Sequence, residues 1–277
     1  MSIVDAHVHV LPERVRADPA SLRADRWFSE CHASPRARLV GPEELIEAMD
    51  ADAIDRAVCF TWPFAAPAMC AEANDWLAAV MRRYPERIIG FGIVNPRDPG
   101  AAREATRCAR LGLRGIGELN ADAQGWDLGD LGSLRGLVDA CVAAGLTWNL
   151  HASEPVGHAY PGKGTAHPQR IEALAAEFGE LRIVAAHLGG GLPFYAHMPE
   201  VRALFGNNLW VDTAALPWLY ADGAVADVVR LIGAERVLLG SDFPLLRASR
   251  SVASLRQELS DADAATVLGG AAERLFG

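Results

Sequence analysis

His7 and His9 stand one residue apart in a short apolar run, "VDAHVHV", that begins at residue 4. In a β-strand alternate side chains point to the same side, so both imidazole rings would face one way. Two imidazoles on one face are half of a typical metal site, because imidazole is a common metal ligand in proteins. Polar residues that merely alternate with valine explain the pair equally well, so the rest of the chain has to decide.

Four more side chains that can bind metals follow other apolar runs. Glu118 follows "LRGIG", His151 follows "LTWNL", His187 follows "RIVAA" and Asp242 follows "VLLGS". Taken singly, each has an ordinary structural explanation. Glu118 could begin a helix or pair with Arg114, and Asp242 could be a turn residue.

Eight short apolar runs, rich in β-branched residues, predict eight β-strands. They occupy residues 2–8, 55–62, 87–94, 113–119, 146–152, 182–188, 208–214 and 236–243. Alanine- and leucine-rich stretches with helical spacing lie between them, at residues 42–51, 71–84, 98–111, 132–145, 167–179 and 226–234. Buried strands that alternate with helices indicate parallel βαβ units, and eight such units close into a barrel.

We therefore predict the α/β class and one domain, a single (β/α)8 (TIM) barrel over residues 1–277, with long loops after strands one and five. These loops span residues 10–42 and 153–168, and loops of such length often carry function. The alternative is an open doubly wound sheet, which usually has a glycine-rich phosphate-binding turn after an early strand. The sequence contains no such turn.

In a barrel the C-terminal ends of all strands meet at one rim, where enzymes of this fold build their active sites. Histidines and carboxylates gathered there would repel one another or lose hydration unless a cation neutralised them. Imidazole and carboxylate together suit zinc, which we expect, and also manganese, iron or nickel. The predicted metal ligands are His7, His9, Glu118, His151, His187 and Asp242.

The bulk composition limits the partners and the compartment. The formal net charge is −9, from 26 basic and 35 acidic residues without a basic block, which argues against nucleic acid as a partner. The 5 cysteines form no C-x-x-C pair, which favours a reducing compartment. With no cationic leader and no apolar stretch of about 18 residues, we expect a cytoplasmic protein without a membrane partner.

The order of these motifs resembles the amidohydrolase superfamily. The similar features are "DAHVH" on the first strand, a histidine after the fifth, a histidine after the sixth and "GSDFP" after the eighth. Within the superfamily, "HLGGGLPFYA" and "DTAA" look typical of the amidohydrolase-2 branch, which includes aminocarboxymuconate-semialdehyde decarboxylase-like proteins. The resemblance covers nearly the whole chain and implies a (β/α)8 barrel with one or two divalent metal ions.

The resemblance also implies a role for each residue. His7, His9 and Asp242 would bind the more buried ion. His151 and His187 would hold a second ion; in members with one ion, one of them binds it and the other contacts the substrate. Glu118 stands on the strand where many members have a carbamylated lysine, and it resembles the bridging glutamate of other members.

We expect a metal-dependent hydrolase that opens an amide, lactone or ester bond of a small molecule with metal-activated water. Asp242 would accept the proton of that water and His187 would polarise the bond under attack, so these two are the predicted catalytic residues. The alternative is a decarboxylase of an aromatic or unsaturated carboxylic acid. The six-residue ligand set favours hydrolysis, whereas the branch favours decarboxylation. The net charge disfavours a nuclease, and a barrel that only binds is the last alternative.

The expected partner is a small-molecule substrate, and a homodimer is the oligomer that we consider. Aromatic residues near the predicted rim either line the pocket or pack against a second subunit: Phe194, Tyr195, Trp218 and Tyr220. Arg14 or Arg16 in the first loop either holds a substrate carboxylate or lies on solvated surface.

Overall fold

The computed structural model describes residues 2–22 and 25–277 of the chain. Eight parallel strands pair in sequence order. They are β1 Val4–His9, β2 Arg56–Phe60, β3 Ile88–Gly92, β4 Gly115–Leu119, β5 Thr147–Leu150, β6 Ile183–Ala185, β7 Leu209–Asp212 and β8 Val237–Leu238. Ala6 N–H donates to the Leu239 carbonyl (2.7 Å) and Asp242 N–H donates to the His7 carbonyl (2.9 Å), which closes the ring between β8 and β1. The predicted α/β fold, a single (β/α)8 barrel, is confirmed.

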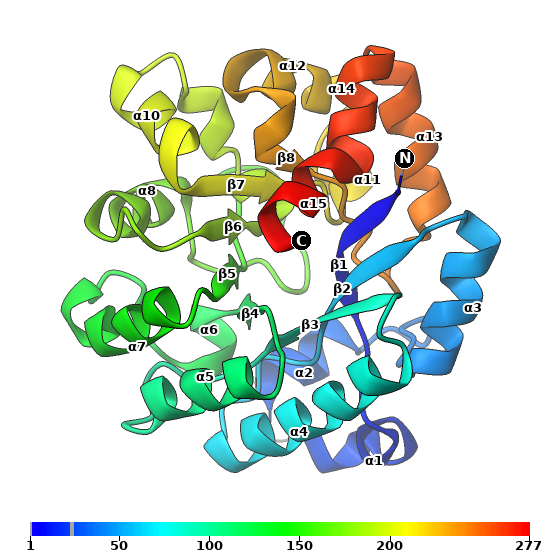
Figure 1. Cartoon of the computed structure of the whole chain (residues 1–277), viewed down its shortest axis with the longest axis vertical. Helices are drawn as coiled ribbons and strands as arrows, with labels where there is room; N and C mark the ends of the chain where they lie inside the picture. The colour runs from blue at the N-terminus through cyan, green and yellow to red at the C-terminus, as the bar shows by residue number, and fades with distance from the viewer. Residues whose placement is uncertain (1, 23–24) are drawn as a thin grey trace.

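Helices that follow the strands form a layer around the barrel (Figure 1). The main ones are α3 Pro42–Asp52, α4 Pro67–Arg83, α5 Ala101–Arg110, α7 Leu131–Ala143, α8 Pro168–Glu177, α10 Pro199–Asn207, α12 Ala224–Ile232 and α13 Ala248–Glu258. Four of them, α3, α4, α8 and α10, begin with proline, whose fixed φ suits the first helical position. The sequence pattern predicted all of these helices except α10 and α13. Within the described residues, none of the helices combines the length and the apolar character needed to cross a membrane.

A C-terminal helical segment closes the N-terminal end of the barrel. It consists of α14 Asp261–Ala265, η4 Thr266–Gly270 and α15 Ala271–Phe276, and α15 lies in front of the strands in Figure 1. The Phe276 ring packs on Phe91, and Phe91 packs on Phe60, each pair with ring centroids 5.5 Å apart. Phe60 in turn lies 4.9 Å from the ring of His7. An apolar floor therefore lies beneath the strand ends, and a ligand has to enter from the opposite rim.

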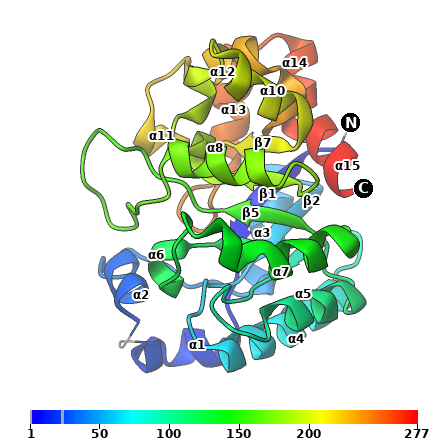
Figure 2. The same cartoon turned by 90° about the vertical axis from the view of Figure 1, so that its left-hand side faces the viewer.

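The two long loops differ in structure. The connection after β1 contains α1 Glu13–Ala17, η1 Pro19–Leu22 and α2 Arg26–Cys31, so it is more ordered than the loop that we predicted. The connection from β5 to α8 has neither helix nor strand. In Figure 2 this connection is the green loop on the left; α2 and α6 (Ala121–Gln124) lie on the same side, opposite the termini. The remaining short elements are α9 Ala186–Gly189, η2 Leu192–Tyr195, α11 Leu216–Leu219 and η3 Ala234–Arg236.

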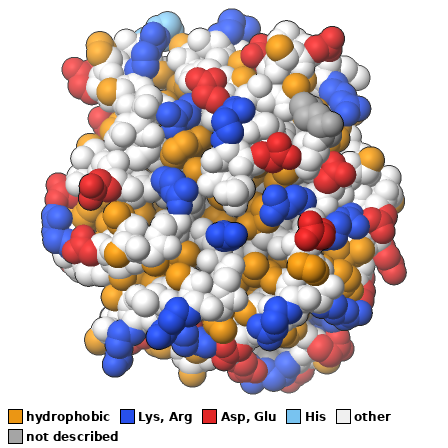
Figure 3. All heavy atoms as spheres, in the orientation of Figure 1, with side chains coloured by type: hydrophobic (Ala, Val, Ile, Leu, Met, Phe, Trp, Pro, Cys, Tyr) orange, Lys and Arg blue, Asp and Glu red, His pale blue; other side chains and the backbone are white. Residues whose placement is uncertain are grey.

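Charged side chains of both signs are interspersed on the outer surface, as Figure 3 shows for the face that carries the termini. Ion pairs between exposed side chains contribute little to stability. The pair of Arg247 with Asp52 differs, because the Asp52 side chain is only 8% exposed. Arg247 Nε and Nη2 donate to the two carboxylate oxygens of Asp52 at 2.9 and 2.8 Å. This pair joins the end of α3 to the start of α13, and so the first and last main helices of the outer layer.

We predict that Asp52→Asn lowers the free energy of unfolding at pH 7 by about 1 kcal/mol, measured by urea denaturation. Burial raises the pKa of Asp52, but hydrogen bonds from Arg247 and Ser249 outweigh it and lower that pKa below 3.8. The stabilisation is therefore complete above pH 3.8 and disappears as the pH falls through the lower pKa of the folded protein. Asp139→Asn, at an exposed position of α7, is the control. A difference that persists in acid contradicts this explanation.

Candidate metal centre

The structure brings together all six side chains that we predicted as metal ligands. His7 and His9 lie at the end of β1 and Glu118 lies in β4, whereas the other three follow their strands: His151 after β5, His187 after β6 and Asp242 after β8. Two groups of three residues each bring one ligand atom per residue within 4.8 Å of one another. The first group is His7, His9 and Glu118; the second is Glu118, His151 and His187. Glu118 belongs to both groups, and Asp242 Oδ1 lies 3.4 Å from His9 Nε2.

Left-handed backbone turns aim two of these side chains at the centre. His187 and Leu188 have φ of 56° and 53°, and Asp242 has φ of 63°. Residues other than glycine adopt this conformation rarely, at a cost of about 1 kcal/mol or more, and such residues cluster at functional sites. Gly190 continues the turn, and a Cβ there would lie 2.4 Å from the Ser153 carbonyl oxygen. The motif "HLGGG" therefore encodes a sharp turn, and β6 ends earlier than the sequence pattern predicts.

Each of the four imidazoles has one ring nitrogen beside an oxygen that accepts a hydrogen bond. The pairs are His7 Nδ1 with Asp212 Oδ2 (2.9 Å), His9 Nδ1 with the Thr61 carbonyl (3.1 Å), His151 Nε2 with the Gly162 carbonyl (2.9 Å) and His187 Nδ1 with the Ala214 carbonyl (3.1 Å). Carbonyl oxygens only accept, and so does an ionised carboxylate. The outer nitrogen of each ring is therefore the one that carries the hydrogen in the neutral, cation-bound form.

The inner nitrogens then present their lone pairs to one another and to two carboxylates. His7 Nε2 and His9 Nε2 are 3.1 Å apart, although in the neutral tautomers neither can donate to the other. His151 Nδ1 and His187 Nε2 lie 2.9 and 3.3 Å from the same oxygen of Glu118. This arrangement is favourable only with positive charge at its centre. The chemistry of the donor set fits a divalent cation, since outer acceptors that fix each imidazole are typical of metal sites.

In the metal-free protein, protons supply this positive charge. Burial lowers the pKa of His7, but the Asp212 carboxylate outweighs it and raises that pKa to about 9. Burial likewise opposes charge on His187, yet Glu118 raises its pKa to about 10. Asp242 is lowered to a pKa of about 2, because the hydrogen bond from His9 and the charge of His7 outweigh its burial. A bound cation would therefore replace protons in this site.

Asp212 is a residue of this site that our sequence analysis did not assign. Its fully buried side chain accepts from His7, from the His187 backbone N–H (3.0 Å) and from Asn149 Nδ2 (3.3 Å). It ends β7, as part of the "DTAA" motif that carried the family resemblance. A polar residue at a strand end was the signal that could have found it.

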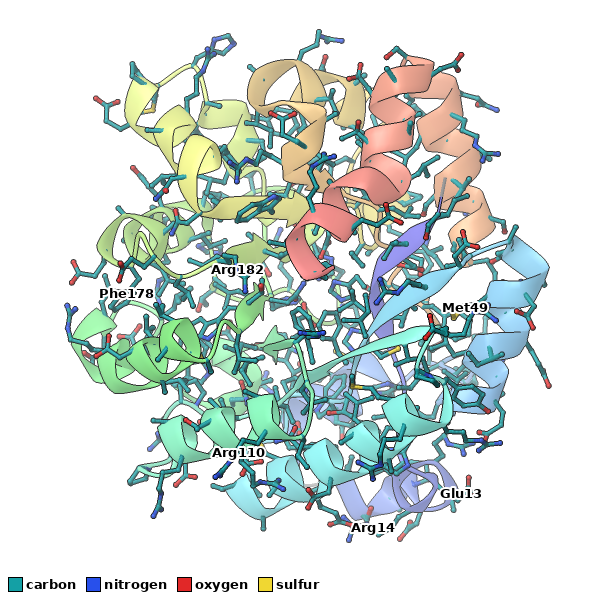
Figure 4. The ribbon with its side chains drawn as sticks, viewed as in Figure 1. Glu13, Arg14, Met49, Arg110, Phe178 and Arg182 are labelled. Atoms are coloured by element: carbon teal, nitrogen blue, oxygen red, sulfur yellow. The ribbon has the colours of Figure 1, made fainter. Side chains whose placement is uncertain are left out.

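The arginines of the first loop lie away from the centre. Arg14 is on α1 at the lower edge of the molecule (Figure 4), and its Nη2 donates to Glu72 at 2.9 Å. Arg16 pairs with Glu13 on the same helix. Aromatic residues of α2 are nearer, since the ring of Trp27 lies edge-on to His151 with centroids 6.1 Å apart. The structure therefore places a tryptophan, and neither of these two arginines, beside the site.

We predict that Asp212→Asn weakens the binding of Mn²⁺ by about 10- to 100-fold, because the amide no longer holds the hydrogen on His7 Nδ1. Isothermal titration calorimetry on the purified proteins measures this change. Asp139→Asn removes an exposed carboxylate of the same size and is expected to leave the affinity unchanged. Equal affinities of wild type and Asp212→Asn contradict the proposed orienting role.

Known proteins match the chain over nearly its full length. A family model described as "Amidohydrolase" matches residues 4–277. The 2-amino-3-carboxymuconate-6-semialdehyde decarboxylase of Dictyostelium discoideum is 24% identical, over 99% of this chain and 91% of the relative. The gamma-resorcylate decarboxylase of Polaromonas sp. is 24% identical, over 97% and 96%. A manganese-bound structure of 5-carboxyvanillate decarboxylase from Novosphingobium aromaticivorans has a TM-score of 0.83 at 21% identity, over 99% of this chain and 97% of that chain.

These comparisons correct the expected reaction. We expected a hydrolase, but the two curated relatives described above are decarboxylases, which agrees with our alternative. The error has a chemical reason: imidazoles and carboxylates around a cation do not specify which bond of the substrate breaks. The neighbouring structure contains manganese, so the comparisons support a divalent ion but give no support to zinc in particular. The resemblance itself is confirmed, and the chain belongs to the amidohydrolase family.

Proposed function

We propose that the protein is a metal-dependent decarboxylase of a small aromatic or unsaturated carboxylic acid. The observation that carries this proposal is the match of two curated decarboxylases to at least 97% of the chain. The geometry supports it, because four imidazoles and two carboxylates form one buried cluster above an apolar floor. This protein's own substrate would be an aromatic or unsaturated carboxylate.

We assign the cation to the six residues of the centre. His7, His9 and Asp242 would hold one ion, and His151 and His187 would either complete its shell or hold a second ion with Glu118. When bound, a divalent cation supplies a Lewis acid that stabilises negative charge on the oxygen atoms of the substrate. Manganese or zinc would serve, with iron and nickel as alternatives.

Asp242 and His187 are the groups that we assign to proton movement. Loss of carbon dioxide leaves an electron pair on the carbon that carried the carboxylate, and this carbon takes up a proton. The Asp242 side chain is 16% exposed, against 8% for Glu118 and 0% for Asp212, so it is the carboxylate most accessible from the rim. His187 Nδ1 faces the Ala214 carbonyl (3.1 Å), which leaves Nε2 on the side of Glu118.

Trp27 would contact the ring of the substrate. Its indole lies edge-on to His151, on the helix that covers the rim. The Trp62 indole donates a hydrogen bond to Asp25 (3.1 Å) and packs edge-on against Phe28, which lies in α2 like Trp27. Aromatic walls favour a flat substrate, because offset and edge-to-face ring contacts are attractive.

Two further expectations stay predictions. A homodimer would cover Phe194, Tyr195 and Trp218, which are 39%, 51% and 52% exposed, whereas Tyr220 is partly buried. A cytoplasmic location and the absence of a nucleic-acid partner rest on composition and charge.

We predict that the Mn²⁺-loaded protein releases carbon dioxide from at least one member of a panel of hydroxylated benzoates and unsaturated dicarboxylates. A coupled assay for carbon dioxide measures turnover, and chelation is expected to abolish it. Asp242→Asn is expected to lower kcat by about 100-fold or more. Asp222→Asn, at an exposed position in the turn before α12, is expected to leave kcat unchanged. Hydrolysis of lactones or N-acyl compounds by the same sample, without release of carbon dioxide, contradicts the proposal.

We predict that Glu118→Gln retains one metal ion per chain, because His7, His9 and Asp242 can hold one ion without Glu118. Elemental analysis of dialysed protein counts the ions in wild type and variant. One ion in both indicates a single-metal centre; two ions in wild type and one in the variant indicate that Glu118 bridges. Complete loss of metal from Glu118→Gln contradicts this assignment.

A further inference from the structure

The connection from β5 to α8 folds around the ammonium group of one lysine. Lys163 is the only lysine of the chain. Its ammonium group donates to the carbonyls of Val156 (2.6 Å) and His158 (3.0 Å), and it lies 5.5 Å from the centre of the Tyr160 ring. Within this segment the Tyr160 hydroxyl also donates to Glu154 (2.8 Å), but the side chain that bonds to the backbone of the segment at two points is Lys163.

Two other contacts fix the turn that contains this lysine. The Ser153 hydroxyl accepts from the Gly164 N–H at 2.8 Å. Asp122 on α6 accepts from the N–H and from the hydroxyl of Thr165, at 2.7 and 2.9 Å. The turn is therefore held at its C-terminal end by the barrel and by α6, and from within by Lys163.

The sequence "PGKG" at residues 161–164 suits this geometry. Gly162 has φ of 95°, a conformation that favours glycine. A Cβ at Gly164 would lie 2.4 Å from Asp122 Oδ2, so glycine lets the backbone lie close to the Asp122 carboxylate here. A glycine on each side of the lysine lets the backbone turn tightly around the ammonium group.

The turn presents the Gly162 carbonyl to His151. This oxygen lies 2.9 Å from His151 Nε2, closer than the Ser153 hydroxyl at 3.4 Å. With a cation on the Glu118 side, the carbonyl would hold the ring hydrogen on Nε2 and leave Nδ1, 2.9 Å from Glu118, as the ligand nitrogen. The other three imidazoles are held by groups at the ends of β2 or β7 or just beyond them: Thr61, Asp212 and Ala214. His151 alone depends on a loop for its outer partner.

We propose that Lys163 is a positioning residue of the metal centre: it shapes the turn whose Gly162 carbonyl selects the nitrogen through which His151 binds metal. This inference rests on the proposed function only in that the centre binds a cation. Outer partners of metal-bound histidines typically change metal affinity by about 10- to 100-fold. Loss of the ammonium group would release the turn and free His151 to rotate or to change tautomer.

Zinc affinity, measured by competition with a chromophoric chelator, tests the proposal. We expect Lys163→Met to weaken the binding of Zn²⁺ about 10-fold and Lys163→Arg to restore most of the loss, because arginine also donates to carbonyls. Arg202→Met is the matched control, since Arg202 Nε donates to the Ala196 carbonyl (3.0 Å) in another loop. Equal Zn²⁺ affinity of wild type and Lys163→Met, or the same loss in Arg202→Met, overturns the proposal.

A second readout needs no variant. Nitrogen-15 NMR of the histidine side chains in the zinc-loaded wild type is expected to show His151 with hydrogen on Nε2 and zinc on Nδ1. Zinc on Nε2 of His151 overturns the proposal even where Lys163→Met does not fold. Zinc binding with this pattern but without decarboxylation refutes the proposed reaction and leaves the role of Lys163 standing. A wild type that binds no zinc and no manganese refutes both.

Discussion

The structure depends on four imidazole rings whose hydrogens are held outward and whose lone pairs point inward. Each outer nitrogen faces an acceptor, so the inner nitrogens of His7 and His9, 3.1 Å apart, have no hydrogen to share in their neutral forms. Glu118 and Asp242 add negative charge at the same point. In a buried site such groups are unfavourable without a cation, because burial penalises unpaired polar groups. Protons provide the charge when no metal is bound, since the Asp212 carboxylate outweighs burial and raises the pKa of His7 to about 9.

The barrel makes this arrangement possible by bringing distant segments to one rim. His7 and Asp212 are 205 residues apart in sequence, yet the closed ring of strands places them in hydrogen-bond contact. The C-terminal helix α15 seals the opposite end, and the aromatic column of Phe276, Phe91 and Phe60 supports His7 from below. Cover from above comes from α2 and the β5–α8 loop, which carry Trp27 and Gly162 beside His151. The centre thus lies on a packed aromatic floor and is covered by the less regular parts of the chain.

Much of this could be predicted from the sequence, since eight buried apolar runs and the polar residues that end them fix both the barrel and the rim. The pairing of each imidazole with its outer acceptor could not be predicted. Asp212 looked like other strand-end residues, and its pairing with His7 depends on the closed ring. The Gly162 carbonyl is a backbone atom, and no residue type marks it as a partner of His151. The reaction was also beyond the pattern, because the same ligands serve hydrolysis and decarboxylation; only comparison with decarboxylases over the whole chain corrected it.

Anomalous X-ray diffraction from crystals grown with Mn²⁺ tests most directly whether the inward lone pairs form a metal site. We predict an anomalous peak at stoichiometric occupancy that contacts Nε2 of both His7 and His9 and a carboxylate oxygen of Asp242. A second peak beside Glu118, on His151 and His187, would extend this result to two ions. A peak held by other residues, or a fully ordered centre without a peak, would contradict it.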